Sequence, residues 1–366
     1  MTDGTNPVSG VNVTAILSSN DFTATSTVAA TTDGSGIAEF ENLVIETAGT
    51  GYTITFDADA AGVADVVSAS FDVTAAAASA LNEVSGSGQS AQINQTLTSP
   101  FVVEVVDGFG NPVSGETVGF SIVATPTDAA GQSLSAASVV TGANGQAAST
   151  LTLGDKVGTY GVDADWSTST VNFTADAESG DASAMSVTTQ PSATTAGAAI
   201  AGPPAVTVVD AGGNPVSGVD VTVSEQGSYV FDGGTTTVAT DASGIATFSD
   251  LVIETADTYT LVFSATGLAD ITSNSFTVDP AAVSASGSTA NATSPHTADG
   301  SDASTVTITP TDVFGNEITG LTDTDFTVNV GTNAVAGTVT ETATAGTYEF
   351  TVTNTTIETV TVVHYR

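Results

Sequence analysis

The chain of 366 residues carries 40 acidic residues against only Lys156 and Arg366, which gives a net charge of −38. A surface of this sign repels nucleic-acid phosphates and anionic lipid headgroups, so we expect no nucleic-acid partner. Because 40% of the residues are apolar and only 11% are charged, the chain has material for packed cores. Its abundance of Val, Thr, Ala and Gly predicts an all-β fold rather than an acidic disordered tail.

The sequence contains no cysteine, and neither a membrane-spanning stretch nor a signal peptide is recognisable in it. The chain has no cysteine, which excludes disulfides, thiol nucleophiles and cysteine-ligated metals. No stretch approaches the roughly eighteen consecutive apolar residues of a membrane span, so no membrane insertion is expected. The opening residues MTDGTNPVSG have neither the basic nor the apolar region of a signal peptide. If the protein is exported, we expect its signal to lie outside these residues.

One turn-like motif recurs along the chain. It reads DGTNPVSG at 3–10, DGFGNPVSG at 107–115, DAGGNPVSG at 210–218 and DVFGNEITG at 312–320. Asp and Asn side chains bond nearby backbone, Gly accepts a positive φ, and Pro fixes its own φ, so the motif is typical of a connector between strands.

The spacing of the motif predicts the domain organisation. Its asparagines, at positions 6, 111, 214 and 316, lie 105, 103 and 102 residues apart. A period of about one hundred residues suits a small autonomous domain and is too long for a solenoid repeat. We therefore expect four repeats, at residues 1–76, 77–179, 180–281 and 282–366.

Short alternating runs flank the motif and predict strands with one buried face. Upstream runs are FVVEVVD at 101, AVTVVD at 205 and STVTITPTD at 304. Downstream runs are VNVTAIL at 11, TVGFSIV at 117 and VDVTVS at 219. The first repeat begins at the turn itself, so we expect it to lack its first strand, to have an open edge and to be the least stable repeat.

A second shared block lies further along each repeat. It reads DGSGIAEFENLVIETAGTGYTITF at 33–56 and DASGIATFSDLVIETADTYTLVF at 241–263, with a reduced version at 142–162. Each block contains a hairpin turn, a strand, a loop and a tyrosine that opens the next strand. We expect these tyrosines to pack in the core with their hydroxyls folded back onto backbone as corners. They are Tyr52, Tyr160, Tyr259 and Tyr348.

The combination of D-x-x-G-N-P-V-S-G, T-D-x-S-G-I-A-x-F and G-T-Y resembles the bacterial immunoglobulin-like group 1 domain. Such domains build the stalks of invasin- and intimin-type adhesins. The repeat at 282–366 is similar to an invasin-like variant found in the same proteins. The resemblance covers essentially the whole chain, although no lectin-like tip and no outer-membrane barrel segment is present.

The resemblance implies tandem immunoglobulin-like β-sandwich domains in an elongated array. It also implies an extracellular position on a bacterial cell surface, as part of a longer chain whose neighbouring repeats are the first partners. The implied function is a structural spacer that projects an adhesive element. Two alternatives remain: a carbohydrate- or matrix-binding module that contacts a glycan or host surface itself, and an S-layer or filament subunit.

One loop has part of the spacing of a calcium site. In DADAAGVAD, residues 57–65, Asp57, Asp59 and Asp65 occupy positions 1, 3 and 9 of an EF-hand-like loop. Ala61 and Ser68 stand where two further oxygen ligands belong. We therefore expect a solvated acidic loop, with calcium binding as the alternative. No cofactor is required by any other pattern, and Ca²⁺ is the one cation that the sequence suggests.

The remaining candidate residues favour structural roles. Trp166, the sole tryptophan, is expected to cover a domain end, with stacking on a sugar ring as the alternative. His296 and His364 lie in loop or terminal context and far apart in the sequence. Without cysteine and without a nucleophile elbow, they assemble neither a metal site nor a catalytic pair. We expect no enzyme activity. The acidic, lysine-poor surface suits a saline medium, which predicts a marine or halophilic source.

Overall fold

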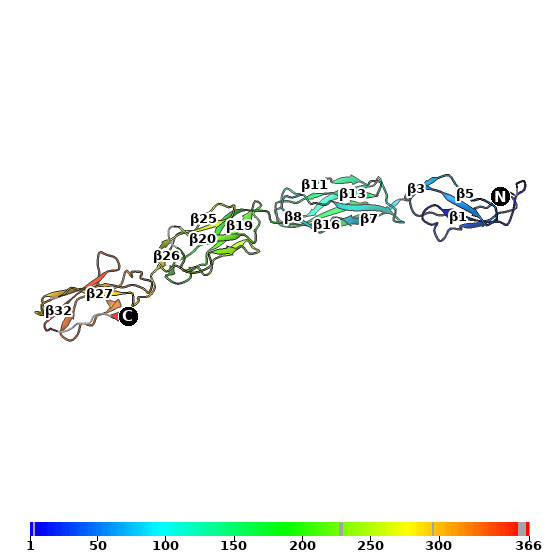
Figure 1. The fold of residues 1–366 in the computed structure, drawn as a ribbon. Helices are drawn as coiled ribbons and strands as arrows, with labels where there is room; N and C mark the ends of the chain where they lie inside the picture. The colour runs from blue at the N-terminus through cyan, green and yellow to red at the C-terminus, as the bar shows by residue number, and fades with distance from the viewer. Residues whose placement is uncertain (3, 227–229, 295, 358–363, 366) are drawn as a thin grey trace. The chain divides into compact units, whose positions relative to one another are not determined.

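The computed structural model describes residues 1–2, 4–226, 230–294, 296–357 and 364–365. Strands make up nearly all their regular structure (Figure 1), and their one helix is a 3-10 turn at Asp323–Asp325. The all-β prediction is confirmed. No helix among the described residues has the length and apolar character to cross a membrane.

The chain divides into two compact units, Met1–Glu178 and Ser179–Arg366. Each unit contains two of the predicted repeats. Every strand pairing among the described residues joins strands of the same predicted repeat.

The repeat at 77–179 is a sandwich of facing sheets. Its larger sheet has the order β12 (Ser138–Val140), β10 (Thr117–Ala124), β15 (Gly158–Trp166), β16 (Ser169–Glu178) and β8 (Gln89–Gln92). A second sheet has the order β13 (Gln146–Ser149), β9 (Phe101–Asp107) and β7 (Ala78–Ser85), and β11 (Ser133–Leu134) pairs with β14 (Leu151–Thr152). Alternate residues of β9 and β10 are fully buried, so the alternating runs of the sequence are strands with one core face.

The repeat at 180–281 has the same arrangement. One sheet has the order β21 (Thr237–Ala239), β20 (Asp220–Glu225), β24 (Leu261–Ala265) and β25 (Ile271–Thr272). A second has β17 (Ala182–Thr189), β19 (Ala205–Asp210) and β22 (Ile245–Thr247), and a third has β18 (Thr194–Thr195), β26 (Phe276–Asp279) and β23 (Asp257–Tyr259). Phe248 and Phe263 pack in the core between these sheets with ring centroids 5.5 Å apart.

The repeat at 282–366 is built around one main sheet. Its order is β27 (Thr289–Ala292), β28 (Ala303–Thr309), β32 (Tyr348–Asn354) and β30 (Ala334–Ala336), and β31 (Thr340–Glu341) also pairs with β32. A short pair joins β29 (Phe326–Thr327) to β33 (His364–Tyr365). Among the described residues of this repeat, the buried core has fewer members than in the two preceding repeats and includes Ile308, Phe326 and Tyr348.

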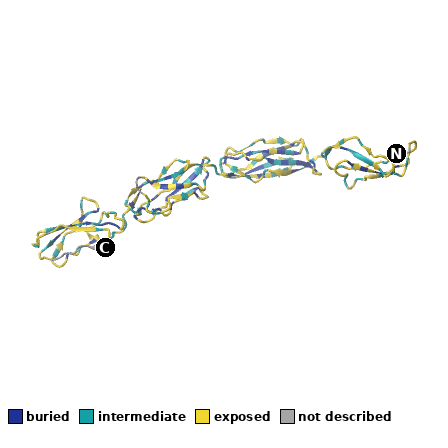
Figure 2. Cartoon of the chain, in the orientation of Figure 1, coloured by how far each residue is buried: buried dark blue, intermediate teal, exposed yellow. Residues whose placement is uncertain are grey.

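The repeat at 1–76 contains only part of this architecture. One sheet has the order β2 (Ala29–Thr31), β1 (Asn12–Leu17), β4 (Ile54–Ala58) and β5 (Val66–Val67), and β3 (Gly49–Tyr52) pairs with β6 (Phe71–Val73). The described residues of this repeat have no counterpart of the sheet formed by β17, β19 and β22. Figure 2 shows the result, with little dark blue on residues 1–76 compared with residues 77–178.

The tyrosine prediction is confirmed for burial at all four positions, since each side chain is at most 3% exposed. Tyr52, Tyr160 and Tyr259 donate their hydroxyls to the carbonyls of Thr47, Lys156 and Thr255, which lie four or five residues upstream. These are tyrosine corners.

Tyr348 departs from this local pattern. Its hydroxyl donates to the carbonyl of Ile318 at 3.1 Å and accepts a bond from the backbone N–H of Leu321 at 2.9 Å. The hydroxyl therefore ties β32 to a segment about thirty residues upstream instead of closing a corner.

A glycine in the hairpin turn of the second block lies against the turn motif of the same repeat, as Gly244 shows. Gly244 has φ +71°, and a Cβ at this position would lie 2.7 Å from the carbonyl oxygen of Val208 and 2.9 Å from Cβ of Pro215. Only glycine combines that backbone conformation with so close an approach. The hairpin turn of the second block is thereby packed against the proline of the turn motif.

Candidate functional site

The acidic loop at 57–65 does not gather a set of ligands in this structure. Asp57, Asp59 and Asp65 are all exposed. Among the described residues, no group of three or more His, Cys, Asp or Glu side chains is placed to hold a metal ion. This placement fits the solvated loop that the sequence favoured, and calcium binding by the three residues stays a prediction.

Trp166 lies at the end of β15 and packs against the core of the repeat at 77–179. Its indole N–H donates to Oε2 of Glu116 at 2.9 Å. The ring is half-buried, so it covers part of the core while its polar edge is satisfied. Stacking on a sugar through the remaining exposed part of the ring stays a prediction.

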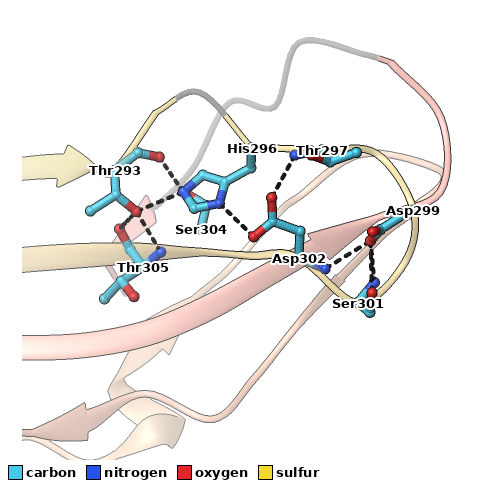
Figure 3. A network of polar contacts seen from close by, with 8 residues as sticks. All are labelled: Thr293, His296, Thr297, Asp299, Ser301, Asp302, Ser304 and Thr305. Atoms are coloured by element: carbon cyan, nitrogen blue, oxygen red, sulfur yellow. Dashed lines mark hydrogen bonds and ion pairs between the residues drawn. The ribbon is translucent and has the colours of Figure 1, made fainter.

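His296 belongs to a hydrogen-bonded network in the loop between β27 and β28 (Figure 3). Its Nε2 lies 3.0 Å from Oγ1 of Thr293 and its Nδ1 lies 3.2 Å from Oδ1 of Asp302. The N–H of Thr297 donates to Oδ2 of Asp302 at 2.7 Å, and this bond together with the His296 contact lowers the pKa of Asp302.

The order hydroxyl, imidazole and carboxylate is that of a nucleophile, a base and an orienting group. The hydroxyl of Thr293 also accepts the backbone N–H of Thr305 at 3.0 Å, which ties the histidine's partner to β28. The bonds drawn in Figure 3 join residues of 293–305 to one another. The network therefore fastens this loop to β28, beside an open cleft of about 320 Å³.

His364, the second histidine, lies in β33 and pairs with Thr327. Its position near the end of the given sequence is the terminal context that was predicted, and its backbone there forms a short strand.

In the turn motif, a single buried aspartate accepts several hydrogen bonds. In DGFGN, Oδ1 of Asp107 accepts the backbone N–H groups of Phe109 and Asn111 at 2.9 Å each. Its Oδ2 accepts Nδ2–H of Asn111 at 2.8 Å and the backbone N–H of Ala76 at 2.9 Å. Ala76 belongs to the segment that enters the repeat, so one carboxylate fastens both the turn and the incoming linker.

The same arrangement recurs in the next two repeats. Asp210 accepts the linker N–H of Gly180, and Asp312 accepts that of Ala281, each at 2.9 Å. Each carboxylate also bonds the motif asparagine of its own turn, Asn214 or Asn316. The corresponding Asp3 of the first repeat lies outside the described residues.

These carboxylates are ionised well below neutral pH. Burial of Asp107, which is 2% exposed, raises its pKa, but the hydrogen bonds from Asn111, Ala76 and Phe109 outweigh burial and lower the pKa to about 2. The pKa values of Asp210 and Asp312 are lowered by the same balance of burial and hydrogen bonds. An ionised carboxylate is the form that can accept all of these bonds.

The sequence identified the motif as a connector but did not reveal that its aspartate binds the linker. The signal was present in the recurrence of Asp and Asn four residues apart, or three in the first copy. The linker residues Ala76, Gly180 and Ala281 contribute only backbone N–H groups, and such a contact leaves no mark in side-chain identity.

Comparison with known proteins agrees with this architecture. The family model of the carboxypeptidase regulatory-like domain matches residues 205–311. None of the curated proteins compared with the chain matches it.

Among solved structures, the adhesin FdeC of Escherichia coli is 19% identical, with a TM-score of 0.51, over 77% of this chain and 91% of the other. The bacterial integrin-binding protein invasin is 21% identical with a TM-score of 0.40, over 76% of this chain and 55% of invasin. InvD of Yersinia pseudotuberculosis is 18% identical with a TM-score of 0.43, over 75% of this chain and 81% of InvD.

The likeness to FdeC at this identity concerns the fold. Together with the facing sheets, the repeated strand order and the tyrosine corners, it establishes that the chain is composed of tandem immunoglobulin-like β-sandwich domains.

Proposed function

We propose that this chain is a spacer segment of a large bacterial surface adhesin, in which its repeats project an adhesive element away from the cell. The proposal places the chain outside the cell, within a longer protein that supplies the anchor and the adhesive element. Its nearest partners are the neighbouring repeats of that protein.

The observation that carries the proposal is the shared aspartate contact of the turn motif. In three successive repeats one buried carboxylate bonds its own turn and the entering linker. Here the recurring polar group is the one that connects modules, which is what a spacer requires.

The motif resemblance and the likeness in fold add support. The motifs resemble bacterial immunoglobulin-like group 1 domains, with an invasin-like variant at 282–366. FdeC and invasin, which share the fold or part of it, are described as an adhesin and as an integrin-binding protein. We extend to this chain only the class of surface adhesin, and the ligand of the whole protein belongs to the adhesive element.

The spacer needs no cofactor and no enzyme activity. The net charge of −38 gives strong self-repulsion at low ionic strength, and counterions screen it at the salt concentrations of seawater or brine. We therefore propose a marine or halophilic source, with Ca²⁺ as an optional ligand of the acidic loop.

A display experiment tests the spacer role. Residues 1–366 are placed between an outer-membrane anchor and a single-domain antibody, on cells that carry a thick surface polysaccharide. The matched control replaces them with a Gly/Ser linker of equal length, which behaves as a collapsed flexible coil. We expect cells with the repeats to capture antigen-coated beads and cells with the flexible linker to capture fewer. Equal capture would overturn the proposal.

The same cells without the antibody test the alternatives. Binding of the bare repeats to a glycan array or to matrix proteins would identify them as a ligand-binding module. Assembly of the purified chain that increases with protein concentration would identify an S-layer or filament subunit. A spacer is silent in both measurements.

A further inference from the structure

A short stretch of sequence recurs just ahead of two of the tyrosine corners. It reads VIETA at 44–48, in the repeat at 1–76, and again at 252–256, in the repeat at 180–281. Its glutamate and threonine are exposed or half-exposed in both copies. The stretch is therefore a surface loop whose backbone is available to a neighbouring repeat.

Within the first unit, the motif asparagine of the second repeat reaches this loop. Oδ1 of Asn111 accepts the backbone N–H of Ala48 at 2.8 Å. Nδ2 of the same side chain donates to the carbonyl oxygen of Glu46 at 2.7 Å. One amide group thus satisfies a carbonyl and an N–H two residues apart, as a paired strand would.

The second unit repeats this contact with different residues. Oδ1 of Asn316 accepts the N–H of Ala256 at 2.8 Å, and its Nδ2 donates to the carbonyl oxygen of Glu254 at 2.7 Å. Two junctions in separate units have the same atoms, the same direction and the same lengths. The same contact therefore occurs at two junctions and is not peculiar to one of them.

The tyrosine corner presents the loop to the asparagine. The carbonyl between the two bonded groups belongs to Thr47 in one loop and to Thr255 in the other, and it accepts the hydroxyl of Tyr52 or Tyr259. The threonine carbonyl is thus bonded to the buried tyrosine of its own repeat, while the glutamate carbonyl and the alanine N–H on either side of it bond to the asparagine of the next repeat.

The aspartate of the turn positions the asparagine from the other side. Nδ2 of Asn111 also donates to Oδ2 of Asp107 at 2.8 Å, and Nδ2 of Asn316 donates to Oδ2 of Asp312 at 2.7 Å. Because both hydrogens of the amide are engaged, its orientation is fixed. Asn111 is 8% exposed, so these bonds are shielded from water.

An apolar contact adds to the junction in the second unit. Phe314 of the turn packs on Gly197 of the preceding repeat, where a Cβ would lie 2.4 Å from the Cζ atom of the ring. The equivalent Phe109 in the first unit is 59% exposed. The asparagine contact is common to both junctions, whereas the phenylalanine is more exposed in the first unit than in the second, where Phe314 is 39% exposed.

We infer that Asn111 and Asn316 are docking groups whose partner is the backbone of the E-T-A loop in the preceding repeat. Bending at the junction requires both Asn–backbone hydrogen bonds to break, so Asn111 and Asn316 set the stiffness of their joints. The inference deepens the proposed spacer function, which requires stiff joints, but it rests on contacts that exist whatever the chain displays.

Pulsed electron–electron resonance between two spin labels measures this stiffness. The chain has no cysteine, so Ser70→Cys and Ser121→Cys place one label on each repeat of the first unit, both at exposed positions. With Asn111 intact we expect a narrow distance distribution. With Asn111→Ala we expect it to widen by about twofold or more, because neighbouring domains move freely when few contacts cross their boundary.

Two further variants keep the result interpretable. Ala48→Pro removes the N–H donor on the partner side and leaves the turn of the second repeat unchanged, so it must also widen the distribution. Asn172→Ala removes an exposed bond from the amide of Asn172 to the carboxylate of Asp163, within the second repeat and without contact to the E-T-A loop, and must leave the distribution narrow. Hydrogen exchange of β1 and β4 in the first repeat and of β15 and β16 in the second verifies that both repeats are folded in each variant.

A narrow distribution in both Asn111→Ala and Ala48→Pro, with the second repeat folded, would overturn the inference. The same measurement with Asn316→Ala, and labels at Thr277→Cys and Val335→Cys, tests the second unit. The outcome is separable from that of the display experiment. If the joints loosen but bead capture by the intact repeats equals that by the flexible linker, the docking role stands and the spacer function fails.

Discussion

The repeats at 1–76 and 180–281 carry nearly the same second block in different surroundings. Phe56 and Phe40 pack with ring centroids 5.5 Å apart and an interplanar angle of 44°, and their counterparts Phe263 and Phe248 have 5.5 Å and 43°. Yet Phe263 is fully buried, whereas Phe56 is only half-buried. Identical local geometry therefore coexists with very different burial.

The difference lies in the partner sheet. In the repeat at 180–281, β19 and its neighbours cover the apolar side chains of the second block, and Leu251 is fully buried. The described residues of the first repeat provide no equivalent cover, and the corresponding Leu43 is half-exposed. An alternating pattern thus specifies which face of a strand seeks burial, but a facing sheet must supply the burial.

The largest expected effect is on the protection of the first repeat as a whole. We expect amides of β1 and β4 to exchange much faster than those of β20 and β24, with a difference in opening free energy of about 5 kcal/mol, the margin of a small domain. Hydrogen-exchange mass spectrometry resolves the two repeats. Equal protection would show that the first repeat is stable without a covering sheet. Replacing Met1 and Thr2 by a copy of residues 180–209 should restore protection.

Replacing the equivalent phenylalanines Phe263 and Phe56 by alanine should show the same difference in burial between the two repeats. Phe263→Ala removes a fully buried ring and should lower the free energy of unfolding of its repeat by about 3–5 kcal/mol. Phe56→Ala removes a ring that is already half in water and should cost about 1–2 kcal/mol. Thermal unfolding followed repeat by repeat measures both. Equal losses would contradict the argument from burial.

Replacing a buried glutamate in the repeat at 180–281 should raise its stability instead of lowering it. Glu225 of β20 is 7% exposed, and its carboxylate has no hydrogen-bond partner among the described residues. Leu17 of the first repeat occupies the same register position opposite β4. Glu225→Leu should therefore stabilise the repeat at 180–281 by about 1–3 kcal/mol at pH 7, the penalty of an unsatisfied buried polar group.

The gain from Glu225→Leu should depend on pH with a definite sign. Burial, with a contribution from the charge of Asp232, raises the pKa of Glu225. A raised pKa means that the folded state favours the protonated form, so the wild-type repeat loses stability as pH rises through that pKa. The advantage of the leucine variant should be largest at neutral pH and should shrink toward pH 4. A gain independent of pH would assign it to packing alone.

The tyrosine corners should respond alike in the two repeats. Tyr52 and Tyr259 are each 3% exposed, so this end of the first repeat is as well covered as that of the third. Tyr52→Phe and Tyr259→Phe should each lower the free energy of unfolding by about 0.5–1.5 kcal/mol through loss of the bond to the upstream carbonyl. Tyr52→Phe should lie at the upper end of this range, because the hydroxyl of Tyr52 also accepts Nδ2–H of Asn20 at 3.1 Å. A loss confined to Tyr259→Phe would mean that exposure in the first repeat extends to its corner.

The smallest expected effect concerns calcium. The loop at 57–65 carries three aspartates, whereas the aligned stretch 264–270 retains only Asp270. For a solvated loop, millimolar CaCl₂ should protect neither stretch more than NaCl of equal ionic strength. Extra protection that appears at 57–65 and not at 264–270, measured by hydrogen exchange, would establish a calcium site in the first repeat.

Much of this fold was predictable because one-faced strands and turns leave strong local signals. The runs at 101, 205 and 219 alternate and form β9, β19 and β20. The tyrosines were recognised as core residues from their constant place in each block.

What the sequence could not provide depends on distant partners. Tyr348 resembled the other corner tyrosines, but its hydroxyl finds Ile318 and Leu321, about thirty residues upstream. Glu225 sits at a position where alternation calls for an apolar side chain, and only the fold reveals that its carboxylate is buried. The contacts of Asn111 and Asn316 span about sixty residues and end on backbone atoms, which carry no signature of their own.

The reliance of the joint on backbone atoms has an evolutionary consequence. Asn111 bonds the carbonyl of Glu46 and the N–H of Ala48, groups that nearly every amino acid possesses. Side chains in this exposed loop can therefore diverge in charge, size and antigenic character while both hydrogen bonds persist. Substitutions that alter the exposed side chains of this loop should therefore leave both backbone groups, and with them both hydrogen bonds to Asn111, in place.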